Sequence, residues 1–211
     1  MSNNFSYQLY ERYPKLETCR AEIEKAGEFL NAAFRAGNVI YCCGNGGSAS
    51  DSEHIVGELM KGFLKKRPLP EDERAALTAQ GERGAFLADN LQKSIPAVSL
   101  VNSISLGTAF ANDVAPELIF AQQIYGLGKK GDVLIAISTS GNSKNILYAI
   151  DAARAKGVVV IGLTGSSGGK MAPLCDVAIK VPTNSTPEIQ EYHLPIYHYL
   201  CQLVEAQNFS V

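Results

Sequence analysis

Short apolar runs alternate with segments of helical periodicity along most of this 211-residue chain. A run with apolar residues at consecutive positions is typical of a strand that is buried on both faces. Strands that alternate with helices form right-handed βαβ units, which place the strands in one parallel sheet between two layers of helices. The sequence therefore predicts an α/β fold, a three-layer sandwich around a five-stranded parallel sheet, with strands at residues 38–43, 95–101, 132–137, 158–163 and 176–181.

Long helical regions are expected at both ends of the chain. Residues 5–36 carry apolar side chains at spacings of three, four and seven, and Pro14 marks a break or a restart in that pattern. We therefore assign residues 1–36 to an N-terminal helical region and residues 187–207 to a long C-terminal helix. Further helices are predicted at residues 48–63 and 142–155, and a helical pattern that is broken near Pro116 follows the second strand.

Residues 65–93 differ in character from their surroundings. They are rich in charge, contain two prolines and separate the predicted helix at residues 48–63 from the second strand. We expect one or two short helices in this inserted charged segment. The length of the chain is close to that of one average domain, so residues 1–211 are interpreted as a single domain.

Composition and charge exclude several classes of protein. Hydrophobic residues make up 46% of the chain, which is enough for a packed core and excludes a disordered class. The net charge of −2 gives no support for a nucleic-acid or anionic-membrane partner. The longest uncharged stretch, residues 94–112, contains Pro96 and several polar residues and is not a membrane span. Five cysteines without a C-x-x-C pair, and no visible signal peptide, predict a reduced cytoplasmic protein.

The loop after the first predicted strand is rich in glycine. Residues 44–49, GNGGSA, fit a relaxed G-x-G-x-x-A dinucleotide pattern. No acidic residue follows the second strand and the chain has no P-loop sequence, so we expect no nucleotide. The glycines have two readings: a tight turn that needs their backbone freedom, or a loop whose N–H groups meet an anion or a sugar hydroxyl.

A second loop, residues 138–143 (STSGNS), follows the third predicted strand and carries several hydroxyl groups. Ordinary capping of the next helix by Ser140 or Asn142 needs only one such group. Hydroxyls together with the free N–H groups of a helix start form a suitable cradle for a phosphate monoester. We therefore predict phosphate binding at this loop.

Two helices carry candidate catalytic groups. His54 and Glu58 are four residues apart and share one helix face, either as a surface pair, as a base with an imidazole, or as two ligands of a divalent metal. The last helix carries Gln190, His193 and His198. Gln190 and His198 are eight residues apart, about 12 Å along an ideal helix, and Pro195 between them is expected to kink the helix. Spacing alone leaves open which of the two histidines enters a site.

Five segments share a pattern that goes beyond any single motif: CGNGGSASDSEHIVGEL (43–59), AND (111–113), GDVLIAISTSGNSKNIL (131–147), LTGSSGGKM (163–171) and TPEIQEYHLPIYH (186–198). Together they resemble the sugar isomerase (SIS) domain family, and within it the phosphoheptose isomerases. The resemblance implies an SIS domain with flavodoxin-like strand order. It also implies Glu58 and His198 as the catalytic residues. The implied zinc ligands are His54, Glu58, Gln190 and His198, with one Zn²⁺ per subunit. The implied substrate-binding residues are Asn45, Gly46, Gly47, Glu58, Asn112, Asp113, Ser138, Thr139, Ser140, Ser143 and Gln190.

The resemblance further implies a homotetramer with its sites at subunit interfaces, and a phosphorylated sugar as substrate. The expected reaction is the isomerisation of sedoheptulose 7-phosphate to D-glycero-D-manno-heptose 7-phosphate through an enediol. One alternative is a non-catalytic SIS protein, either a phosphosugar-binding regulator or a protein that binds a replication initiator. Another is an isomerase of a different ketose phosphate, since residues 65–93 are longer than the usual linker of the family.

Overall fold

The computed structural model describes residues 4–209, and its centre is one parallel sheet. The strands lie in the order β2-β1-β3-β4-β5, which is the flavodoxin-like order that the resemblance implied. The register pairs Ile40 with Val133, and Val133 in turn with Val159. The strands are β1 (Ile40–Cys43), β2 (Ala97–Ser99), β3 (Val133–Ile137), β4 (Val159–Thr164) and β5 (Val177–Lys180).

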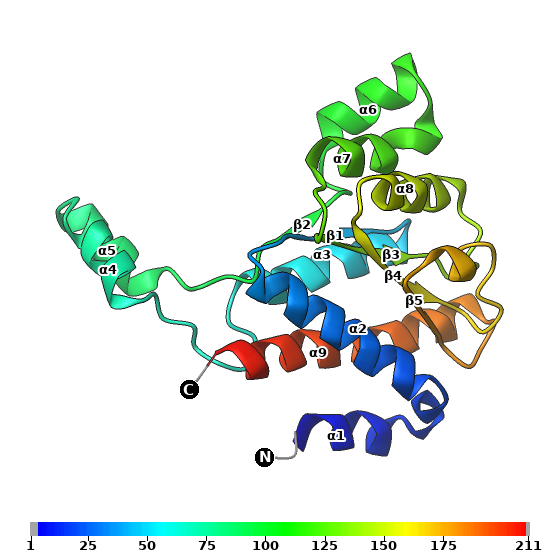
Figure 1. The fold of residues 1–211 in the computed structure, drawn as a ribbon, viewed down its shortest axis with the longest axis horizontal. Coiled ribbons are helices and arrows are strands. Elements are labelled where there is room, and N and C mark those ends of the chain that lie inside the picture. The colour runs from blue at the N-terminus through cyan, green and yellow to red at the C-terminus, as the bar shows by residue number, and fades with distance from the viewer. Residues whose placement is uncertain (1–3, 210–211) are drawn as a thin grey trace.

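Helices cover both faces of the sheet, so the predicted three-layer sandwich is confirmed (Figure 1). Side chains alternate along each strand: Ile40 and Cys42 belong to one buried cluster, and Tyr41 and Cys43 to the other. The first cluster packs beneath α2 (Arg20–Arg35), α3 (Gly47–Met60) and α9 (Thr186–Asn208). The second cluster packs beneath α7 (Ile119–Leu127) and α8 (Lys144–Ala155).

The two ends of the chain lie on the same side of the sheet (Figure 1). The predicted break at Pro14 is confirmed: α1 (Asn4–Arg12) ends before it, a 3-10 turn, η1 (Pro14–Cys19), begins at it, and α2 follows. The predicted C-terminal helix is α9, which continues as one helix through the buried Pro195.

The inserted segment contains two helices, at the upper end of the prediction. They are α4 (Glu71–Thr78) and α5 (Glu82–Asn90), which pack against each other as a hairpin. Figure 1 shows this hairpin extending away from the sheet, connected to it by two segments of irregular chain. At its root, the backbone N–H of Lys93 donates to the carbonyl of Arg67 at 2.7 Å, which joins the outgoing and returning strands.

The remaining elements are one helix and two 3-10 turns. Pro116 breaks the helical pattern as predicted, because a 3-10 turn separates two helices there. Among the described residues no helix has both the length and the apolar character required to cross a bilayer. The elements not yet named are α6 (Ile104–Asp113), η2 (Pro116–Leu118) and η3 (Ala172–Leu174).

Candidate active site

The glycine loop connects β1 to α3 at the carboxyl edge of the sheet. Gly46 has φ +57°, a conformation that favours glycine, and it precedes the first residue of α3. A Cβ atom added to Gly47 would lie 2.4 Å from the amide nitrogen of Gln190. Gly47 is therefore needed for a close approach of the Gln190 side chain from α9 to the backbone of this loop.

The glycine loop is tied to the loop after β3. Asn45 and Asn145 exchange two side-chain hydrogen bonds, 2.9 Å and 2.8 Å long. Asn145 lies in the first turn of α8, immediately after the hydroxyl-rich segment. Two of the predicted binding loops, almost a hundred residues apart in sequence, are thus neighbours at one edge of the sheet.

The hydroxyl-rich loop leaves the start of α8 without a side-chain cap. The helix begins at Lys144, and its N-cap is Ser143, not Ser140 or Asn142, the residues considered for ordinary capping. The Ser143 hydroxyl does not cap the helix and instead pairs with the hydroxyl of Ser138 at 3.1 Å. Uncapped N–H groups beside paired hydroxyls are suited to an anionic ligand such as a phosphate monoester.

The rest of this loop is held by its backbone. Ser140 is exposed, and its hydroxyl accepts a hydrogen bond from the Asn142 N–H at 3.2 Å. The carbonyl of Thr139 accepts from the N–H of Gly165 at 3.1 Å, which ties the loop to the end of β4. Ser140 therefore presents a hydroxyl to solvent from a fixed backbone.

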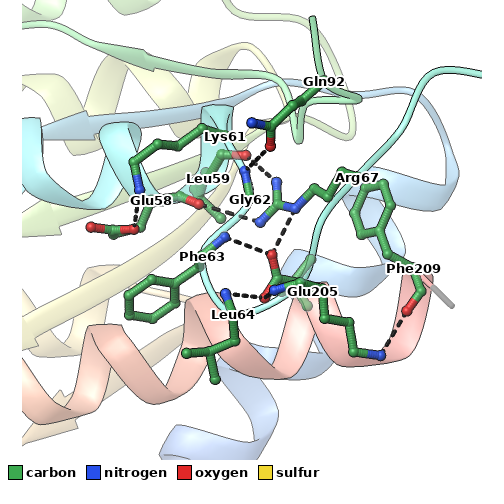
Figure 2. A network of polar contacts seen from close by, with 12 residues as sticks. Glu58, Leu59, Lys61, Gly62, Phe63, Leu64, Arg67, Gln92, Glu205 and Phe209 are labelled. Carbon is green, nitrogen blue, oxygen red and sulfur yellow. Dashed lines mark hydrogen bonds and ion pairs between the residues drawn. The ribbon is translucent and has the colours of Figure 1, made fainter. Parts of the chain in front are cut away.

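His54 and Glu58 form the pair that their spacing predicted. Nε2 of His54 lies 3.3 Å from Oε1 of Glu58, and the other carboxylate oxygen pairs with Nζ of Lys61 at 3.0 Å. The Glu58 side chain is 13% exposed, so it is partly withdrawn from water. Figure 2 shows its carboxylate beside Lys61.

His198 of α9 adjoins this pair. The rings of His54 and His198 are 5.0 Å apart, edge to face, and the Phe63 ring lies 5.4 Å from His198 on another side. Nε2 of His198 is buried without a hydrogen-bond partner. Burial and the neighbouring His54 lower the pKa of His198, so its imidazole is neutral at pH 7.

Tyr197 orients His54 from the other side. Its hydroxyl lies 3.0 Å from Nδ1 of His54 and 3.3 Å from Oδ1 of Asp51. Burial raises the pKa of Asp51, although the Tyr197 hydrogen bond and His54 act in the opposite direction. A partner on Nδ1 fixes the ring and directs Nε2 of His54 toward Glu58.

His193 lies outside this cluster. It is fully buried, and neither ring nitrogen forms a hydrogen bond of normal geometry, although the backbone of Thr164 lies near the ring. Burial lowers the pKa of His193 to about 4. Of the two histidines that spacing could not separate, His198 is the one that adjoins His54 and Glu58.

The predicted residues form two groups within one chain. Both Gln190 and His198 belong to α9. Gln190 lies beside Gly47, at the start of α3, whereas His198 lies beside His54. Gly47 and Glu58 are eleven residues apart, about 16 Å along the helix, so the carboxylate lies at the far end of α3 from the glycine loop. The cradle with Gln190, and the cluster of Glu58 with the histidines, are therefore separate groups.

Asn112 and Asp113 belong to neither group. Both are exposed at the end of α6, where the Asn112 amide donates to the Asp113 carboxylate at 2.9 Å. The structure does not bring them to the other predicted residues. The next element, η2, does reach the start of α8, where a cavity of about 250 Å³ is lined by Pro116, Glu117, Lys144 and Asn145.

The donor types around His54 fit zinc, which prefers imidazole and carboxylate ligands. Nε2 of His198 has no hydrogen-bond partner and is available to coordinate a metal, whereas Nε2 of His54 already faces Glu58. Among the described residues, no three or more His, Cys, Asp and Glu side chains are arranged to hold a metal ion. Gln190 lies about two helical turns from His198, as its sequence spacing predicted.

Sequence reasoning missed the residues that support the site from other elements. Lys61, three residues after Glu58, could have been found from helical spacing. The contacts of Phe63, Asn145 and Tyr197 join positions about a hundred residues or more apart, for which a sequence pattern gives no signal.

Comparison with known proteins agrees with this geometry. A model of the SIS domain matches residues 6–93 and 92–165. The phosphoheptose isomerase of Rhodospirillum rubrum is 44% identical over 191 residues, covering 90% of this chain and 88% of the relative. Phosphoheptose isomerase 2 of Campylobacter jejuni is 40% identical over 205 residues, covering 97% and 90%.

Solved structures give the same result. The phosphoheptose isomerase of Neisseria gonorrhoeae superposes with a TM-score of 0.74 at 30% identity, covering 96% of this chain and 95% of that one. The enzyme of Francisella tularensis gives a TM-score of 0.76 at 28% identity, covering 96% and 94%. The chain therefore belongs to the SIS domain family, in its phosphoheptose isomerase branch.

Proposed function

We propose that this protein isomerises sedoheptulose 7-phosphate to D-glycero-D-manno-heptose 7-phosphate, a ketose–aldose conversion in heptose biosynthesis. The observation that carries the proposal is the cluster of Glu58 with His54 and His198, which combines a carboxylate with a neutral imidazole. A protein that only binds a phosphosugar has no need of this cluster. The names of the relatives also favour an enzyme over a regulator.

The reaction moves one hydrogen between adjacent carbons, and Glu58 is the proposed base. Its carboxylate removes a proton from C1 of the ketose, and the electron pair forms the C1–C2 double bond of the enediol. His198 gives a proton to the carbonyl oxygen on C2 at the same stage. The O1 hydroxyl then returns a proton to His198 as the C1 carbonyl forms, and Glu58 returns a proton to C2. A positioned base of this kind contributes roughly 10²–10⁴-fold.

His198 is the proposed group that serves the two oxygens. Because its imidazole is neutral at pH 7, it donates an N–H hydrogen bond to the oxygen on which charge develops. A neutral donor avoids an ion pair with Glu58 that would weaken the base. His54 is then a positioning residue, because it contacts both Glu58 and His198.

The loop from Ser138 to Ser143 is the proposed phosphate cradle. Its hydroxyls and the uncapped start of α8 would hold the ester end of the sugar, away from the reacting carbons. Asn45, Gly46, Gly47 and Gln190 would contact the sugar itself. Binding energy from the phosphate then aligns C1 and C2 with the base.

We propose that His54, Glu58, Gln190 and His198 are the ligands of zinc, with one ion per subunit. When bound it would polarise the carbonyl and the hydroxyl of the sugar. A ligated Glu58 is a weaker base, so the metal and the proton transfer compete for this carboxylate. Metal analysis of the purified protein and of the Gln190→Ala variant tests the ligand set without an activity assay. Equal zinc content in both proteins would exclude Gln190.

We also propose a cytoplasmic homotetramer with the sites between subunits. The separation of Glu58 from the cradle along α3 supports this arrangement, because a cradle from one copy can be completed by a carboxylate from another. Mixing Glu58→Gln protein with Ser143→Ala protein tests it. Partial recovery of activity is expected after subunit exchange, and no recovery would contradict shared sites.

One assay tests the proposed reaction directly. The purified protein is incubated with a panel of ketose phosphates in D₂O, and the sugars are analysed for carbon-bound deuterium. Exchange with sedoheptulose 7-phosphate, together with formation of the aldose, is expected. Exchange only with another ketose phosphate would reassign the substrate, and no exchange with any of them would favour a regulator.

A further inference from the structure

A fully buried ion pair lies at the base of the candidate catalytic cluster. Nε of Arg67 donates to Oε1 of Glu205 at 2.8 Å, and the two side chains are 0% and 1% exposed. Arg67 stands just before the inserted hairpin, and Glu205 stands near the end of α9 (Figure 2). A buried pair of this kind rarely adds net stability over apolar residues of similar size, so another reason for it should be sought.

Arg67 binds the end of the helix that carries Glu58. The guanidinium donates to the backbone carbonyl of Leu59 at 2.6 Å and to that of Glu58 at 3.3 Å. The last carbonyls of a helix have no partner within the helix, and here a charged group supplies one. Figure 2 shows the Glu58 carboxylate directed away from Arg67 and toward Lys61. Arg67 therefore fixes the backbone of Glu58 without contacting its carboxylate.

Glu205 binds the segment that follows this helix. Its carboxylate accepts hydrogen bonds from the backbone N–H groups of Phe63, Leu64 and Lys65, at 2.8, 2.7 and 3.1 Å. The Phe63 ring in turn packs against His198. Glu205 thus holds the residue that contacts the second catalytic candidate.

The same face of α9 presents both groups. Glu205 is seven residues after His198, almost two complete turns of helix. His198 therefore contacts His54, and Glu205, almost two turns later, contacts the end of α3 through Arg67. These two connections determine where Glu58 stands relative to His198.

We infer that Arg67 and Glu205 are positioning residues, which hold the Glu58 carboxylate and the His198 ring in the arrangement that the reaction needs. This inference rests on the proposed function. The pair touches neither substrate nor reacting atoms and acts through the backbone of Glu58 and through Phe63. A misplacement of about 1 Å between reacting groups can lower a rate roughly 100-fold.

The test is the double variant Arg67→Met/Glu205→Leu, which removes both charges together and leaves no unpaired ion in the core. Its thermal unfolding is expected to stay cooperative. The kcat for the proposed substrate should fall about 10- to 100-fold, while KM changes less than about threefold, because the phosphate cradle is distant. The single variant Arg67→Lys keeps the charge but not the planar fork of the guanidinium, so it should retain only part of the wild-type kcat.

Arg74→Met is the matched control. Arg74 forms an ion pair with Asp89 at 2.7 Å, but that pair lies within the exposed hairpin. The control should keep the wild-type kcat. A folded double variant with wild-type kcat would overturn the inference, as would an equal loss in the control.

A crystal structure of the double variant separates this inference from the proposed function. If the wild-type protein isomerises none of the sugars, the proposed function fails, and the arrangement of side chains still answers the positioning question. We expect the Glu58 carboxylate to move relative to His198. An unchanged arrangement of the two side chains would refute the positioning role, whatever the reaction.

Discussion

The side-chain amide of Gln190 lies against the backbone of Gly47, so close that a single added methyl group would be 2.4 Å from its nitrogen. This contact joins α9 to the glycine loop at the carboxyl edge of the sheet. It places a polar side chain from the last helix beside the loop that the sequence assigned to substrate binding.

Replacement of Gly47 by alanine should therefore affect binding more than folding. Gly47 is the first residue of α3, and alanine favours a helix more than glycine by about 1 kcal/mol. The added methyl group displaces the Gln190 side chain, which is flexible at its far end. We expect an unchanged or higher melting temperature and at least a tenfold lower kcat/KM. The same substitution at Gly57, where a methyl group meets no atom within 4 Å, is the control. Equal kinetics for the two variants would contradict the role of the Gln190 contact.

The Glu58→Gln variant tests the proposed base. The amide keeps the size of the carboxylate and a contact to His54 but cannot accept the C1 proton. We expect kcat for sedoheptulose 7-phosphate to fall by roughly 10³-fold, within the range for a positioned base. Binding of the sugar phosphate, measured by calorimetry, should survive. Near-normal turnover would remove Glu58 from the mechanism.

The Ser140→Ala/Ser143→Ala variant tests the phosphate cradle. A hydrogen bond to a charged group contributes about 1.5–3 kcal/mol, so the loss of two should raise KM roughly 100-fold or more. Little effect on kcat is expected at saturating substrate, because the cradle is distant from the proposed base. Ser105→Ala, in an exposed position on α6, serves as the control. An unchanged KM in the double variant would rule out the cradle.

The buried His193 predicts a dependence of stability on pH. Its pKa is about 4 in the folded protein against 6.5 for the ordinary side chain, so the unfolded chain binds the proton more tightly. The free energy of unfolding therefore includes the full contribution of neutral His193 above pH 6.5. This contribution, roughly 3 kcal/mol in total, is lost as the pH falls from 6.5 to 4. The difference in unfolding free energy between wild type and His193→Met, measured by urea denaturation, should change over this range. A constant difference would show that His193 does not titrate in this way.

The fold was predictable because its signals are local. Consecutive apolar residues in each strand, the helical spacing of the segments between them and Pro14 each act within a few residues. All five strands form at their predicted places; four are shorter than predicted, and β4 has its predicted length but lies one residue later. The pairing of the Ser143 hydroxyl with that of Ser138 was not predicted, because it depends on how the loop folds back on itself.

By itself, the sequence determined the parallel sheet, the loops at its carboxyl edge and the helix face that carries His54 and Glu58. The tertiary structure alone decided that His198 rather than His193 adjoins them, and that Gln190 meets Gly47 instead. It also decided that Arg67 and Glu205 meet beneath Glu58. Periodicity specifies which side of an element each residue occupies, whereas the alignment of α9 with α3 follows from packing both helices onto one sheet face.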